Sequence, residues 1–110
     1  MTEKVKLINL CNHIVVLCDE GSNAIYTLHE SGQTAYEVHS NHSEWVNGVR
    51  VYRNGPSTVF GIPDPQPGVF YVVSNRVRLA APERKDILAP TDLVRHDGNV
   101  IMARALQGNW

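Results

Sequence analysis

Turn signals recur along this chain and constrain its fold more than any other feature. The pairs Asn47-Gly48 and Asp97-Gly98 are typical of two-residue turns that join antiparallel strands. The segments between the turn signals are short and rich in β-branched and aromatic residues, and the signals return at intervals of roughly 8–15 residues. We therefore predict a mainly β protein, a small antiparallel β-sandwich or barrel with one short helix.

The first half of the chain predicts several strand pairs. Residues 5–10 and 14–18 are expected to form a β-hairpin or a bent strand. The alternation of Tyr26 with Leu28 and of Tyr36 with Val38 predicts a second hairpin around residues 31–33. Residues 40–43 are interpreted as a loop, and residues 45–53 either pair with the preceding strand or fold back at Asn47-Gly48.

The second half predicts a strand that runs into a helix. After a turn at residues 54–56 and a short strand at 58–60, the apolar segment Val69–Val73 is expected to form a buried strand. Ser74 then caps a helix over Asn75–Ala81, which ends before Pro82. Residues 92–95 and 99–106 are expected to pair around Asp97-Gly98, and residues 107–110 to fray unless Trp110 packs on a neighbour.

Bulk properties indicate one ordinary globular domain. A chain of 110 residues with a formal charge of -1 fits a single β-rich domain over residues 1–110. This charge gives no general attraction to nucleic acid or to a membrane surface. No Lys or Arg lies between Leu7 and Val49, whereas most basic residues follow. Such an asymmetry favours either association of copies, giving a homo-oligomer, or two oppositely charged sheets within one molecule.

The cysteines and the N-terminus suggest an intracellular protein. Cys11 and Cys18 are predicted to be reduced thiols, and no segment resembles a signal peptide or a membrane span. The predicted location is the cytoplasm.

The strongest candidate site lies where the strand Val69–Val73 meets the helix. The first amides of a helix lack partners and carry partial positive charge, so they favour an anion. We expect an anionic small ligand there. Residues near the helix start, basic residues after the helix and an aromatic ring that can stack on a base would bind it. The candidates at the helix start are Ser74, Asn75 and Arg76, the basic residues after the helix are Arg84 and Lys85, and the aromatic residue is Tyr71. Alternatively, Ser74 only caps the helix and residues 83–86 form surface salt bridges.

Other chemistry has weaker support in the sequence. His39 and His42 have a spacing that suits metal ligation, but no accompanying ligand motif is present, so neither a metal nor a cofactor is predicted. Cys11 and His13, two apart, are expected to lie about 6–7 Å from each other on a strand, which favours Cys11 as core filler. A hydrolase built on His39 and His42 remains a further hypothesis.

Two blocks of sequence resemble a family of small, largely uncharacterised proteins of phages and actinobacteria. Residues 8–16 are similar to its "NLTPHxIxV" start, and residues 61–74 with 82–86 and 95–101 to its "GLPEPQxGxxYIVS…PxRxD…RDxxGxIxG" pattern. The chain departs at Cys11-Asn12, where the family has Thr-Pro, and at Ala103, where Gly is usual. The resemblance implies a phage-type accessory protein that acts inside a bacterium.

These observations lead to three functional hypotheses. The first is a non-enzymatic protein that sequesters an anionic small ligand, such as a nucleotide immune signal, and so counters host defence. The second is a protein-interaction or structural module that assembles through sheet edges and charge asymmetry, with itself or with a host protein. The third is the histidine-dependent nucleotide hydrolase.

Overall fold

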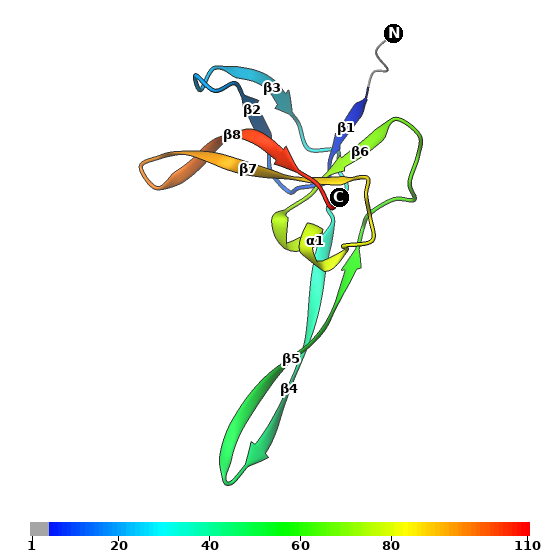
Figure 1. Cartoon of the computed structure of the whole chain (residues 1–110), viewed down its shortest axis with the longest axis vertical. Coiled ribbons are helices and arrows are strands. Elements are labelled where there is room, and N and C mark those ends of the chain that lie inside the picture. The colour runs from blue at the N-terminus through cyan, green and yellow to red at the C-terminus, as the bar shows by residue number, and fades with distance from the viewer. Residues whose placement is uncertain (1–4) are drawn as a thin grey trace.

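The computed structural model describes residues 5–110, and for residue 54 the backbone alone. Within these residues the chain forms a mainly β body from which one long hairpin projects (Figure 1). The predicted mainly β class with one short helix is confirmed; of the predicted antiparallel sandwich or barrel, the main sheet is barrel-like, but it also contains parallel pairs. The elements are β1 (Lys6–Asn9), β2 (Val15–Cys18), β3 (Ala24–Leu28), β4 (Tyr36–Val46), β5 (Val49–Phe60), β6 (Val69–Val72), α1 (Asn75–Ala80), β7 (Ile87–His96) and β8 (Asn99–Gln107). In the described part of the chain, no helix has both the length and the apolar character needed to cross a membrane.

The body is built on one mixed sheet of six strands in the order β1-β6-β7-β8-β2-β3. The pairs β7–β8 and β2–β3 are antiparallel, whereas β1–β6 and β6–β7 are parallel. Strand β2 also pairs with β8 in parallel, through the single residue pair Leu17 and Ala103. A bridge between Asn9 and Glu30 brings the two ends of the sheet together, so the sheet nearly closes into a barrel.

A buried asparagine holds this closure together. Asn9 is almost fully buried, and its side-chain amide donates hydrogen bonds of 2.9 Å to the carbonyl oxygens of His13 and Leu28. Its Oδ1 accepts a hydrogen bond of 2.8 Å from the backbone N–H of Cys11. Because the polar atoms of Asn9 have partners, its burial is not penalised and the side chain links β1 to the ends of β2 and β3.

The core lies between the parallel strands and α1. Leu10, Tyr71 and Ile87 are buried together with Val77, which projects from the helix. Ser74 caps α1 as predicted, since its Oγ accepts a hydrogen bond from Val77 N at 3.2 Å. A second buried cluster on the β2 side contains Cys11, which confirms its prediction as core filler. Neither Cys11 nor Cys18 forms a disulfide, as predicted.

Two predicted hairpins are wrong. Strands β1 and β2 do not pair with each other, because β1 lies beside β6 and β2 lies between β3 and β8. Strands β3 and β4 do not pair either, since β3 folds back on β2 through a tight turn. In that turn the Asp19 carboxylate accepts hydrogen bonds from the backbone N–H groups of Gly21 and Asn23, at 3.0 and 2.9 Å.

The projecting hairpin, called the arm here, consists of β4 and β5 joined at Asn47-Gly48. Both turn residues have positive φ, 49° and 80°, as the predicted tight hairpin requires. The loop expected at residues 40–43 and the turn expected at 54–56 are wrong, because both segments lie within the arm strands. A bulge in β5 places Gly55 and Pro56 opposite Ser40, and a Cβ added to Gly55 would clash with the carbonyl oxygen of Ser40.

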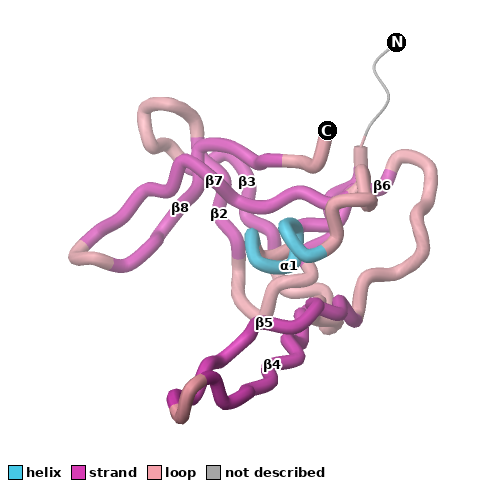
Figure 2. The backbone as a smooth tube through the Cα atoms, turned by 60° about the horizontal axis from the view of Figure 1, so that its bottom comes forward, coloured by secondary structure: helices cyan, strands magenta, loops and turns pink. Residues whose placement is uncertain are grey.

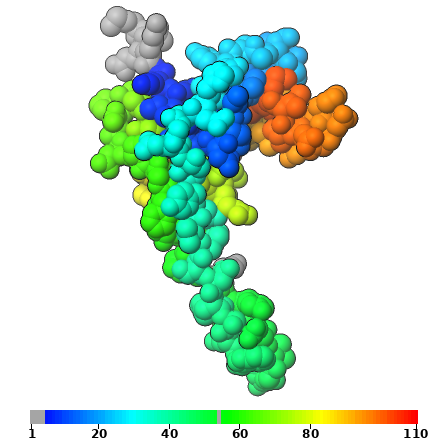
Figure 3. Space-filling model, turned by 180° about the vertical axis from the view of Figure 1, so that it is seen from behind, coloured from blue at the N-terminus to red at the C-terminus, as the bar shows by residue number. Residues whose placement is uncertain are grey.

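The arm gives the molecule an elongated shape. Its principal extents are 62 × 38 × 26 Å, and its radius of gyration is 17.2 Å. A compact chain of this length has a radius of gyration of about 13 Å. Figure 2 shows α1 beside the base of the arm, and Figure 3 shows the arm as a narrow column that leaves the body.

The C-terminal residues are anchored rather than frayed. The side-chain amide of Asn109 donates hydrogen bonds to the carbonyl oxygens of Arg78, Ala81 and Arg84, at 3.2, 3.0 and 3.1 Å. These carbonyls end α1 and the turn after it, so a residue far along the chain caps the helix. Trp110 lies against Phe70, with ring centroids 6.1 Å apart.

Candidate functional site

The residues predicted at the helix start already have partners within the fold. Besides the cap made by Ser74, Asn75 Oδ1 accepts hydrogen bonds from Arg78 Nε and Nη2, at 3.0 and 2.7 Å. Arg78 in turn donates to Asn109 Oδ1 at 3.2 Å. Ser74 and Asn75 therefore hold the helix and the C-terminal residues in place.

Arg84 forms a structural ion pair. Its guanidinium donates two hydrogen bonds of 2.8 Å to Asp86 and one of 2.7 Å to the carbonyl oxygen of Pro63. This hydrogen bonding raises the pKa of Arg84 and lowers the pKa of Asp86. Arg84 therefore links the proline-rich turn at residues 63–68 to the segment after α1.

Lys85 and Tyr71 also serve the fold. Lys85 Nζ donates to the carbonyl oxygens of Asn109 and Pro82, at 2.7 and 3.2 Å. The Tyr71 ring is buried in the core, and its hydroxyl donates to the carbonyl oxygen of Asp64 at 3.4 Å. Arg84 lines one cleft, with Glu83 and Val59, and Ser74 and Arg76 line another, so the predicted residues do not line one common cleft.

Arg76 belongs instead to a polar cluster between α1 and the base of the arm. Its Nε lies 3.4 Å from Glu37 Oε1, and His39 Nε2 lies 2.9 Å from the same oxygen. Ser57 Oγ lies within hydrogen-bonding distance, 2.8 Å, of His39 Nδ1. The Glu37 side chain is only 5% exposed, and no donor in the described residues is aligned for a hydrogen bond to its Oε1. Glu37 is thus a largely buried carboxylate that faces the positive charge of Arg76 and the imidazole of His39.

Two clefts open on either side of this cluster, and both are lined by Glu37 and Arg76. The first, of about 260 Å³, also contains Ser74 and His13. The second, of about 250 Å³, contains His39 and Ser57 and has an apolar wall formed by Leu79 and Ala80. In the described residues no group of three or more His, Cys, Asp or Glu side chains is placed to hold a metal ion.

Cys11 and His13 do not form a nucleophilic pair. Burial raises the pKa of the Cys11 thiol, which disfavours the nucleophilic thiolate. His13 lies at the surface with its Nδ1 2.9 Å from the carbonyl oxygen of Ile14.

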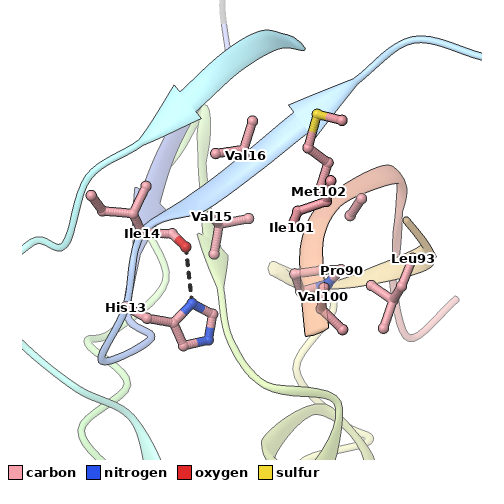
Figure 4. A pocket seen from close by; sticks show the side chains of 10 residues that line it. His13, Ile14, Val15, Val16, Pro90, Leu93, Val100, Ile101 and Met102 are labelled. Atoms are coloured by element: carbon pink, nitrogen blue, oxygen red, sulfur yellow. Dashed lines mark hydrogen bonds between the residues drawn. The ribbon is translucent and has the colours of Figure 1, made fainter. Parts of the chain in front are cut away.

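A larger, mainly apolar cleft of about 380 Å³ lies between β2 and the β7–β8 hairpin (Figure 4). Strand β2 meets β8 at one residue pair only, so their edges diverge and leave the cleft open between them. Several of its residues remain exposed although they are apolar, among them Ile14, Val100 and Ile101. The lining residues are His13, Ile14, Val15, Val16, Pro90, Leu93, Val100, Ile101, Met102 and Ala103.

The arm presents the largest set of exposed apolar side chains. Near its tip, Trp45 and Tyr52 share one face with Arg50, whose guanidinium lies 5.0 Å from the Trp45 ring centroid and 6.0 Å from that of Tyr52. At its base the rings of Tyr36 and Phe60 stack, with centroids 5.5 Å apart. The exposed large apolar residues of the arm are Tyr36, Val38, Trp45, Val46, Val49, Tyr52 and Phe60.

No protein-family model, curated protein or solved structure matches this chain. The resemblance to phage and actinobacterial proteins therefore stays a prediction.

Sequence reasoning offered the Asn47-Gly48 hairpin as one of two alternatives, but it missed the length of the arm and the polar cluster. The arm is visible in the sequence once Asn47-Gly48 is taken as its tip, because counting outward pairs Trp45 with Arg50 and Ser43 with Tyr52. Glu37 and His39 have the spacing of two that places side chains on one strand face. Ser57 and Arg76 carry no such signal, since the bulge shifts the register and α1 meets the arm only in the folded chain.

Proposed function

We propose that this chain is an assembly module in which the arm tip of one copy binds the apolar cleft of a second copy. The observation that carries the proposal is the arm itself, a two-stranded ribbon with seven exposed large apolar residues. A two-stranded hairpin alone is at best marginally stable in water, and contiguous exposed apolar surface is typical of interfaces. Burial of the arm tip in a partner would remove the apolar residues of the tip from water.

The apolar cleft has the chemistry to receive such a tip. Its walls are aliphatic, and it lies between two diverging strand edges. At the arm tip, Val46 and Val49 supply apolar surface on one face of the ribbon, and the Trp45 ring supplies it on the other.

Charges next to the two surfaces are also complementary. Arg50 has no carboxylate within ion-pair distance in the part of the chain that the structure describes. Beside the cleft, Asp97 is exposed at the tip of the β7–β8 hairpin, whereas Asp92 Oδ1 lies 3.6 Å from Arg104 Nη1. Arg50 at the tip and Asp97 beside the cleft carry opposite charges, which favours the arm-to-cleft orientation over contact between two arms.

The contact is heterologous, because the arm and the cleft are different surfaces of one chain. The test therefore uses one variant for each surface, Trp45→Ala/Tyr52→Ala on the arm and Ile101→Asp in the cleft. Light scattering coupled to size exclusion should show an oligomer for the wild type and a monomer for each variant. An equimolar mixture of the two variants should form a one-to-one dimer, since one intact arm still finds one intact cleft.

A matched control is Leu79→Ala, which shortens an exposed apolar side chain on α1, away from both surfaces, and should leave the oligomer unchanged. A wild type that is monomeric at all concentrations overturns the proposal. A mixture of variants that remains monomeric overturns the arm-to-cleft contact. A host protein that co-purifies with the arm intact, and not with the arm variant, would replace the second copy as the partner.

A second candidate function is the binding of an anionic small ligand, such as a nucleotide signal sequestered by a phage-type accessory protein in the bacterial cytoplasm. It is supported by Arg76, whose side chain is 78% exposed and lines a cleft with Ser74. Glu37 in the same cleft opposes an anion. Calorimetric titration with a panel of cyclic and ADP-ribose-type nucleotides tests it: binding lost in Arg76→Ala and kept in Arg84→Ala supports it, and no heat from any nucleotide ends it.

A further inference from the structure

The polar cluster at the base of the arm has the order of a hydroxyl–imidazole–carboxylate relay. Glu37 and His39 are two apart in β4, so they share one face of the strand. The antiparallel register places Ser57 of β5 directly opposite His39. The two contacts follow from this placement, 2.8 Å from Ser57 Oγ to His39 Nδ1 and 2.9 Å from His39 Nε2 to Glu37 Oε1.

The contacts select one tautomer of His39. A carboxylate has no proton to donate, so the ring proton belongs at Nε2, which lies 2.9 Å from Glu37 Oε1 without the alignment of a hydrogen bond. His39 Nδ1 is then the acceptor for the Ser57 hydroxyl. This arrangement prepares Ser57 to lose its proton to His39 while the resulting imidazolium faces a buried carboxylate.

We propose that Ser57, His39 and Glu37 form a hydrolytic site for esters of small carboxylic acids. Ser57 Oγ attacks the ester carbonyl carbon, and its proton passes to His39 Nδ1. The tetrahedral intermediate then expels the alkoxide, which takes this proton and leaves as the alcohol. Water, deprotonated by His39, attacks the acyl-Ser57 ester, and the acid is released as the proton returns to Ser57 Oγ.

The second cleft sets the substrate class. Its volume of about 250 Å³ and its apolar wall of Leu79 and Ala80 suit a short acyl chain. Arg76, largely exposed and lining the same cleft, supplies the positive charge next to the oxyanion that forms at the carbonyl oxygen. Glu37 acts as a positioning residue, because it contacts His39 and Arg76.

The proposed site uses one histidine, unlike the hydrolase built on both His39 and His42. His42 is three residues after His39 in β4, which places it on the other face of the strand, and it lies opposite Arg53. His42→Ala is therefore a control that removes an imidazole from the arm without touching the relay.

The experiment measures covalent labelling by a fluorophosphonate with intact-mass detection, and hydrolysis of p-nitrophenyl acetate, both on the full chain. The wild type should take up one adduct, located on Ser57 by peptide mapping. Ser57→Ala should lose the adduct, and His39→Gln should slow labelling about 100-fold, the lower end of the usual contribution of a general base. His42→Ala and Ser43→Ala should label at the wild-type rate.

Glu37→Gln separates positioning from simple structural support. The imidazolium of His39 is faced by Glu37 from β4 and by Arg76 from α1, with the neutral Ser57 from β5. Removing the Glu37 charge should slow labelling, and Glu37→Asp should restore part of the rate, while near-ultraviolet circular dichroism stays unchanged. An unchanged rate in Glu37→Gln removes Glu37 from the relay, and an adduct rate in Ser57→Ala or His39→Gln equal to that of the wild type overturns the site. The arm-tip variant Trp45→Ala/Tyr52→Ala should label normally, so the site is tested independently of assembly.

Discussion

The body and the arm use the same kinds of residue in opposite ways. In the body, Leu10, Tyr71 and Ile87 are 0%, 1% and 0% exposed. In the arm, Trp45, Val49 and Tyr52 are 66%, 63% and 72% exposed. The body strands are covered by α1 and by the curl of their own sheet, whereas the distal arm has no second layer (Figure 1). Apolar strand residues therefore stabilise a fold only where another element covers them.

The largest difference should appear when one apolar side chain is shortened in each region. Leu10→Ala should lower the free energy of unfolding by about 2–5 kcal/mol, because it leaves a cavity in the core. Val49→Ala should change it by no more than about 0.5 kcal/mol, since that side chain is already in water. Urea unfolding in the Ile101→Asp background, in which the arm has no cleft to bind, measures both. A large loss for Val49→Ala would mean that the arm is packed against something within its own chain.

An ion pair in each region gives the next comparison. Arg84→Ala should cost about 2 kcal/mol of stability, because Asp86 and the Pro63 carbonyl lose a charged hydrogen-bond donor at a mostly buried position. Arg53→Ala, which removes the partner of Glu44 on the exposed arm, should cost at most about 1 kcal/mol. Thermal unfolding of both variants checks this order, and equal costs would contradict it.

The smallest effect is the pH dependence of the Arg84–Asp86 pair. Hydrogen bonding from Arg84 holds the pKa of Asp86 below its ordinary value, so the folded state binds that proton less readily than the unfolded state. The stabilisation is complete above the ordinary carboxyl pKa of about 4 and is lost as the pH falls through the lower pKa of the folded state. Asp86→Asn should therefore flatten the acid side of the stability curve.

A double-mutant comparison isolates the pair. In the Arg84→Ala background, Asp86→Asn should no longer alter the acid side, because the carboxylate has already lost its donor. A stability curve that flattens equally in both backgrounds would mean that a group other than Arg84 lowers the pKa of Asp86.

Local signals in the sequence predicted most of the elements but few of their partners. Asn47-Gly48 and Asp97-Gly98 both form the expected turns, since only a few residue types adopt positive φ without strain. Ser74 and Pro82 mark the start and end of α1 for reasons that lie within one helical turn. The pairing of β1 with β6, across about sixty residues of chain, has no local signal at all.

The candidate site shows the same division. Ser74, Arg76 and Arg84 were grouped from the sequence because they lie near one another along the chain. In the fold Arg84 binds Asp86, while Arg76 faces Glu37 of the arm. Which side chains meet across different elements depends on how those elements pack, and a local sequence pattern does not show that packing.

The sequence by itself determined the class of protein, the tight turns, the capped helix and the burial of Cys11, because each depends on backbone preference or on hydrophobicity over a few residues. The tertiary structure alone decided which strands pair, that β4 and β5 leave the body as an arm, and that Ser57, His39 and Glu37 meet beside Arg76. These features depend on contacts between distant segments, whose geometry is set by closing the sheet around one core.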